Sequence, residues 1–259
     1  MPGIADSGEG NPTSYLLEQI TLEAKGSTNG SNTYFGYNAN NQVSEIKRVN
    51  WGYVTYNNDP PVRQENTITY SFEYSNQLAV KVTQKDGYAS WTLEYDYVGD
   101  QIAKKTIRYA DGSVQDSTLY RYDTDGNLTE AVQYTDKANY KYEFTYGNNL
   151  ITMTHYTFNF YPQKKDRIEF SGFDKKINFI RTINGLPEPF CNEELSFLFY
   201  LTSAAGNYTL TKSYGRIGIN DVFGTFTTGN YSYEYNEEGL PIRMYSDSHT
   251  EIFKYRKYK

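Results

Sequence analysis

Aromatic and polar residues alternate along most of this chain. In the segment 140–146, aromatic rings occupy every even position, whereas lysine, glutamate and threonine occupy the odd ones. The same period of two recurs in 70–74 and 231–235. Because successive side chains of a β-strand point to opposite faces, this pattern predicts strands with one aromatic face and one wetted face.

Short turns separate these alternating segments. The clearest copy of the recurring unit is residues 120–128 (YRYDTDGNL), in which an aromatic run leads into an Asp/Asn/Gly turn. Between Tyr74 and Phe173 the copies begin roughly 21 to 27 residues apart, which fits two strands and two turns. The Asp-Gly pairs at 86–87 and 111–112 are typical of the linking hairpin turns.

This spacing predicts an all-β fold, an antiparallel up-and-down meander of about 16–18 strands. The sheet is expected to be barrel-like or half-barrel; whether it closes, flattens or takes in a plug stays open. A soluble protein is favoured over a membrane barrel, because Lys104 and Glu130 interrupt the aromatic face. Residues 14–259 are expected to form one hairpin-repeat domain, and residues 1–13 a disordered spacer.

Charge and cysteine content narrow the functional classes. The net charge of −6 opposes nucleic-acid binding, which needs a basic face, and a single cysteine, Cys191, excludes an intramolecular disulfide. The sequence has no run of 18 apolar residues, so no transmembrane segment is predicted. The Gly/Pro-rich start resembles the spacer after a cleaved export or lipoprotein signal. We therefore expect an exported protein, in the periplasm or anchored by a lipid at the outer-membrane surface.

Three stretches interrupt the rhythm and are the expected contact loops: residues 51–65, 183–194 and 215–230. Prolines 60 and 61 exclude a central strand in the first, and glycines make the third irregular. Between the last two, residues 195–200 and 208–214 are expected to form a degenerate hairpin. Long loops on a repetitive scaffold are the usual place for binding.

The polar residues of the turns offer little catalytic chemistry. Asp123–Asn127 has oxygen ligands at alternate positions, as calcium loops do, but it lies between two strands and is interpreted as a turn. His155 lies on the Ile151 and Met153 side of its strand and is expected to be packed. Neither His155 nor His249 has a neighbour at metal-ligand spacing, and no catalytic, metal or cofactor site is predicted.

Pairs of adjacent acidic residues give only slight support to a carbohydrate hydrolase, which is the third choice of function. Glu193–Glu194 and Glu237–Glu238 are adjacent, so in a strand they would point to opposite faces and would not form a carboxylate dyad. The more promising feature is aromatic. Most rings are expected in the core, but Trp51, Tyr53 and Trp91, near loop ends, are candidate contacts for a sugar ring or a protein partner.

The unit at 120–128, with weaker copies beginning at Tyr34, Tyr70, Tyr142 and Tyr231, resembles the tyrosine–aspartate (YD, RHS-type) repeat, whose hairpins wind into a shell. Most copies lack the Asp or Gly of that motif. The tyrosine-rich meander over residues 15–259 looks more like a family of uncharacterised exported proteins of Bacteroides-type bacteria. That resemblance implies a porin-like fold and brings no known activity.

These observations favour a non-catalytic cell-envelope or secreted protein that binds a glycan or another envelope protein. The alternative is a purely structural shell or assembly subunit.

Overall fold

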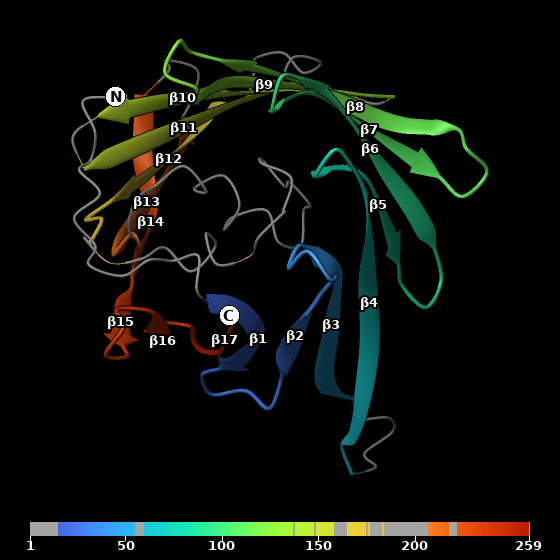
Figure 1. The fold of residues 1–259 in the computed structure, drawn as a ribbon. Helices are drawn as coiled ribbons and strands as arrows, with labels where there is room; N and C mark the ends of the chain where they lie inside the picture. The colour runs from blue at the N-terminus through green and yellow to red at the C-terminus, as the bar shows by residue number, and fades with distance from the viewer. Residues whose placement is uncertain are drawn as a thin grey trace.

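The computed structural model describes residues 15–54, 60–136, 138–147, 149–157, 165–174, 207–217 and 222–258, with the single positions 176 and 183. Seventeen strands and no helix lie in these ranges (Figure 1). The strands are β1 (Tyr15–Ala24), β2 (Gly30–Tyr37), β3 (Val43–Val54), β4 (Val62–Ser75), β5 (Leu78–Lys85), β6 (Ser90–Val98), β7 (Gln101–Tyr109), β8 (Val114–Tyr122), β9 (Leu128–Thr135), β10 (Asn139–Gly147), β11 (Leu150–Thr157), β12 (Lys165–Ser171), β13 (Leu210–Ile217), β14 (Val222–Asn230), β15 (Ser232–Tyr235), β16 (Pro241–Tyr245) and β17 (His249–Lys257).

The strands form one antiparallel meander that bends into a ring. From β1 to β14 each strand pairs with the next in the chain, β15 pairs with β16, and β16 pairs with β17. The ring is joined by a ladder between β1 and β17, from Tyr15 opposite Lys257 to Ala24 opposite His249. The predicted all-β meander is confirmed, and the sheet is a nearly closed barrel (Figure 1).

A β-bulge recurs near the rim at which the even-numbered strands β2, β4, β6 and β8 end. At each copy the last tyrosine of the strand lies opposite a buried residue that follows the turn, and the next pair skips one residue of the following strand. A bulge of this kind disrupts the ladder locally and bends the strand, which helps to curve the sheet. The shifts lie at Tyr37, Tyr74, Tyr97, Tyr122 and, in β15, Tyr235.

Four of these tyrosines, together with Tyr146 and Tyr255, connect neighbouring hairpins at this rim. The Tyr74 hydroxyl donates to the carbonyl of Val43, the residue that lies opposite Tyr37. In turn, the Tyr97 hydroxyl donates to Ala79, which lies opposite Tyr74. Six such bonds span 2.5–3.1 Å, and we call this edge of the barrel the tyrosine rim. They run from Tyr37 to Leu17, Tyr74 to Val43, Tyr97 to Ala79, Tyr122 to Ile102, Tyr146 to Leu128 and Tyr255 to Pro241.

The inner face of the ring carries the hydrophobic core. Tyr70, Val82, Ile46 and Ile102 are fully buried, and Tyr95, Tyr120 and Phe144 belong to the same cluster. Lys105 also faces inward, opposite Tyr95, and is 4 % exposed. The repeating aromatic positions therefore form the core, as the alternation predicts.

The outer face is lined by ion pairs. Lys81 contacts Glu73 at 2.8 Å, and Lys141 lies between Glu130 at 2.7 Å and Glu143 at 2.8 Å. The hydrogen bonds that Lys141 donates to these two carboxylates, that to Glu130 first, raise the pKa of Lys141 above its usual value. An outer wall of paired charges suits water rather than lipid. In the described part of the chain, no helix is long and apolar enough to cross a membrane.

The bulges also correct one sequence-based expectation. Lys104 and Glu130 do not interrupt the aromatic face, because each follows a bulge that shifts the alternation by one residue. Lys104 lies opposite Asp96 and Glu130 lies opposite Arg121, both on the outer side. The inward lysine is Lys105.

Two predictions on irregular segments are wrong. Residues 215–230 are not a loop throughout, since β14 occupies 222–230 and pairs with β13. The 208–214 segment does not form a hairpin with 195–200, because β13 pairs with β12 on one side and with β14 on the other. The expected spacer at residues 1–13 and the contact segment 183–194, apart from the buried Ile183, lie outside the described residues.

Candidate functional site

Trp51 and Tyr53 lie on the outer face, near the end of β3 opposite the tyrosine rim. They alternate with inward residues of the strand, so both rings project to the same side. Tyr53 is 45 % exposed, and Trp51 is half-buried. On the neighbouring strand β4, Glu65 lies opposite Trp51 and Arg63 lies opposite Tyr53. We call these four side chains the outer aromatic patch.

The packing around Trp51 fixes the position of its indole. Trp51 lies opposite Gly30 of β2, and a Cβ atom at Gly30 would come within 2.5 Å of Trp51 Cζ2 and 2.6 Å of the Leu22 carbonyl oxygen. Glycine is therefore needed where the ring crosses β2. The Arg63 guanidinium lies over the indole, 5.2 Å from its centroid, and contacts the Glu65 carboxylate at 2.6 Å. This arrangement gives an aromatic surface bordered by one cation and one anion.

Trp91 does not join this patch. It lies opposite Gln84 on β5 and Tyr109 on β7. Along β6 it alternates in phase with the core residues Leu93 and Tyr95, so it belongs to the inner face. The structure brings Trp51 and Tyr53 together and places Trp91 on the other side of the barrel wall.

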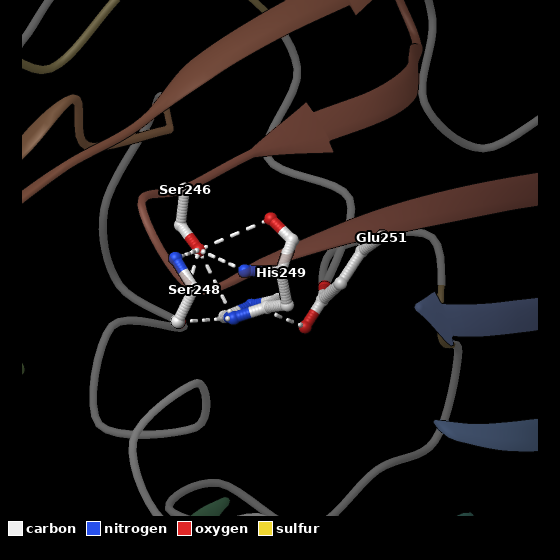
Figure 2. Close-up of polar contacts among 4 residues, drawn as sticks. All are labelled: Ser246, Ser248, His249 and Glu251. Atoms are coloured by element: carbon white, nitrogen blue, oxygen red, sulfur yellow. Dashed lines mark hydrogen bonds and ion pairs between the residues drawn. The ribbon is translucent and has the colours of Figure 1, made fainter. Parts of the chain in front are cut away.

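A cluster of serine, histidine and glutamate lies at the turn between β16 and β17 (Figure 2). His249 Nδ1 is 3.0 Å from Ser246 Oγ and 2.9 Å from Ser248 Oγ. On the other side of the ring, His249 Nε2 is 3.5 Å from Glu251 Oε1. Glu251 is 6 % exposed, and its Oε2 has no hydrogen-bond partner in the described residues.

These residue types are those of a nucleophilic hydrolase, but the geometry is that of a turn. Ser246 Oγ accepts the backbone N–H of Ser248 at 3.3 Å and that of His249 at 3.1 Å. The serine oxygen is thus occupied by the turn, and the two N–H groups that could stabilise an oxyanion point at it. The cluster stabilises the hairpin and orients His249 toward Glu251. Sequence reasoning missed the contact between His249 and Glu251, although their spacing of two residues on one strand places both on one face.

His155 is packed, as predicted. Its ring stacks on Tyr142, with centroids 4.8 Å apart and an interplanar angle of 13°, and on Tyr140 at 5.7 Å. Asp166 Oδ2 lies 3.7 Å from His155 Nδ1. No group of three or more metal-ligating side chains occurs among the described residues.

The Asp123–Asn127 segment is a structural turn. Asp123 Oδ1 accepts the backbone N–H of Asp125 at 2.9 Å and that of Asn127 at 2.8 Å. Hydrogen bonds from Asn127, its side chain first, lower the pKa of Asp123. The carboxylate that would bind calcium is used within the turn, and Gly126 adopts a φ of 84°.

Comparison with known proteins supports the fold and leaves the activity open. No protein-family model and no curated protein matches the chain. The structure is similar to that of a porin-like protein from Bacteroides uniformis, with a TM-score of 0.59, 12 % identity, and coverage of 93 % of this chain and 96 % of that one. A porin-like protein from Bacteroides vulgatus aligns with a TM-score of 0.40, 13 % identity, and coverage of 92 % and 98 %. The likeness to the first defines the class as a porin-like β-barrel fold.

Proposed function

We propose that this chain is a non-catalytic, envelope-associated β-barrel that binds a saccharide at the outer aromatic patch. The porin-like protein of similar fold comes from a Bacteroides species, which supports a place in the periplasm or, through a lipid anchor, at the cell surface. The charged outer wall supports a barrel that stands in water.

The observation that carries this proposal is the pair of outward rings beside two charged side chains. An aromatic ring offers an apolar face on which the apolar face of a sugar ring can stack. Arg63 and Glu65 lie opposite these rings, and a guanidinium and a carboxylate supply donors and acceptors for sugar hydroxyls. The indole is already held against Gly30, so binding would order few additional groups.

The second candidate, a structural assembly subunit, rests on a different feature. In the described part of the chain, the β3–β4 hairpin projects past the end of the β4–β5 ladder, and a projecting hairpin can contact another chain.

A glycan array followed by calorimetric titration tests the saccharide proposal. We expect Trp51→Ala to weaken binding of the captured glycan by at least about tenfold, since stacking anchors of this kind dominate binding energy. Gly30→Ala should weaken it too, by displacing the indole. The matched control is Tyr88→Ala, which removes a ring that is 99 % exposed in the turn between β5 and β6.

Two outcomes would overturn the proposal. One is an array that captures no glycan, and the other is a captured glycan whose affinity is unchanged by Trp51→Ala. Capture of an envelope protein that depends on Trp51 would replace the saccharide with a protein partner.

A further inference from the structure

A group of polar side chains lies beside the outer aromatic patch, on β1 and β2. Asn32 lies opposite Thr21, and Gln19 precedes Thr21 by two residues on the same face of β1. The neighbours of Asn32 in the strand, Ser31 and Thr33, are buried, so Asn32 belongs to the outer face. Gln19, Thr21 and Asn32 are partly exposed, and we call them the polar ledge.

Hydrogen bonds hold the polar ledge in one arrangement. Thr21 Oγ1 donates to Asn32 Oδ1 at 2.7 Å. Gln19 Nε2 donates to Asn32 Oδ1 at 3.2 Å and to Thr21 Oγ1 at 2.9 Å, and Lys254 Nζ donates to Gln19 Oε1 at 3.2 Å. Because both donors reach Asn32 from β1, its Oδ1 faces β1 and its Nδ2 is turned toward β3. The amide donors of Asn32 therefore lie on the side of the ledge that is next to Trp51.

The indole of Trp51 brings the outer aromatic patch up to this ledge. The ring crosses β2 at Gly30, where a Cβ atom would come within 2.5 Å of its Cζ2. Asn32 follows Gly30 by two residues on the same face, a distance of about 7 Å. Arg63 reaches the indole from β4, on the other side of β3. The patch and the ledge thus form one continuous outer surface from β4 to β1.

We propose that the saccharide bound at the outer aromatic patch is a neutral chain of at least two sugar units, which runs from Trp51 across β2 to the polar ledge. This inference rests on the proposed function and extends its site. One unit stacks its apolar face on the indole. The next unit accepts hydrogen bonds from Asn32 Nδ2 and bonds through a hydroxyl to Thr21 Oγ1.

The spacing of the strands requires more than one sugar unit. Thr21 lies on β1, one strand spacing of about 5 Å beyond β2, and it is also displaced along the strand from the place where the indole crosses Gly30. A ring that is stacked on the indole does not extend to Thr21. The ledge is already ordered by its own hydrogen bonds, so the second unit would immobilise few protein groups.

The charges beside the indole oppose an acidic sugar. Arg63 is paired with Glu65 at 2.6 Å, so its charge is balanced within the patch. Glu23 is exposed and lies opposite Gly30, which places a further carboxylate next to the place where the indole crosses β2. A uronic acid unit would meet like charge there. The amide and hydroxyl groups of the ledge instead suit the hydroxyls of a neutral unit.

The length and charge of the glycan test the proposal. The array carries neutral gluco-, manno- and xylo-oligosaccharides of increasing length, together with acidic oligogalacturonides, and each captured series is titrated by calorimetry. We expect capture of a neutral series. Its affinity should rise at least about tenfold from the single sugar to the two-unit chain, as one or two added hydrogen bonds would give.

Variants of the ledge separate the second unit from the first. Asn32→Ala should weaken binding of the two-unit chain at least about fivefold and leave binding of the single sugar unchanged. Thr21→Val should act in the same direction, whereas Trp51→Ala should weaken binding of both. The matched control is Thr152→Val, which removes a hydroxyl from a partly exposed threonine on β11 and should change neither affinity. Far-ultraviolet circular dichroism should be the same for all variants.

The outcomes distinguish this inference from the proposed function. Equal affinity for one and two units, or a two-unit chain that Asn32→Ala binds as tightly as the wild type, would overturn the extended site and leave saccharide binding at Trp51 in place. Tighter capture of oligogalacturonides than of every neutral series would overturn the neutral class. Capture of no glycan at all would overturn the proposed function, and this inference with it.

Discussion

The two rims of the barrel are built differently. At the tyrosine rim, six phenol-to-carbonyl bonds link neighbouring hairpins, and a bulge lies at four of the six tyrosines. The opposite rim, which we call the arm rim, carries the projecting β3–β4 hairpin, the outer aromatic patch and the Ser246–Glu251 cluster. The difference indicates that one rim holds the fold together, which leaves the other free to vary for recognition.

We expect alkaline pH to have the largest effect, because it ionises the buried phenols of the tyrosine rim. Burial raises the pKa of Tyr97 to about 12, and burial also raises the pKa of Tyr37 and Tyr74 above the usual value. A raised folded-state pKa means that the neutral phenol stabilises the fold fully below about pH 10 and loses this contribution as the pH rises toward 12.

We therefore expect unfolding between those pH values, with phenolate absorbance appearing together with the loss of the circular dichroism signal. Phenolate signals that rise fully while the fold stays intact would show that these hydroxyls are not buried in the native protein.

Removing one tyrosine of the rim should have the next largest effect. Tyr74→Ala deletes a ring packed against the core and should lower the free energy of unfolding by about 3 kcal/mol, in the range for buried aromatic residues. At the arm rim, Tyr53→Ala should change it by less than about 0.5 kcal/mol, because that ring is 45 % exposed. Urea titration of both variants measures the contrast, and equal losses would contradict it.

The hydroxyl alone should account for part of that loss. Tyr74→Phe keeps the ring but leaves the Val43 carbonyl without its phenol donor, at an expected cost of about 1–2 kcal/mol. Tyr88→Phe, in an exposed arm-rim turn, is the control and should be neutral. A Tyr74→Phe chain as stable as the wild type in urea would mean that the hydroxyl bond does not hold the hairpins together.

The turns of the tyrosine rim should show an effect no larger than that of the hydroxyl. Gly126 has a φ of 84°, which an L-residue adopts at a cost of about 1–2 kcal/mol, so Gly126→Ala should be destabilising. Gly87, in an arm-rim turn, has no positive φ, and a Cβ atom added there would meet no other atom within 4 Å, so Gly87→Ala should be neutral or slightly stabilising. Thermal melts of the two variants give this comparison, and it fails if their midpoints move together.

Much of the tyrosine rim is visible in the sequence. The alternating rings, the aromatic before each turn and the Asp/Asn/Gly turns predict hairpins in chain order, as observed. The acceptor of each hydroxyl is not predictable, because Tyr74 and Val43 are 31 residues apart and meet only when the bulges curve the sheet. The strand β14 is not predicted either, since its glycines suggest a loop, although its partner β13 supplies the ladder.

The arm rim is less predictable. The β3–β4 hairpin projects because β5 ends at Lys85, opposite Thr69, whereas β4 begins at Val62. The lengths of neighbouring strands do not follow from either segment alone. Trp91 could have been placed correctly, since its phase with Leu93 and Tyr95 marks the core face. The ladder between β1 and β17 closes the barrel by joining the two ends of the described chain. Local sequence patterns carry no signal for such a pairing.

Amide hydrogen exchange tests the closed ring most directly. We predict that the amides that pair β1 with β17 are protected as strongly as those of the central strands. Fast exchange throughout β1 and β17, with the central strands protected, would contradict the closed barrel.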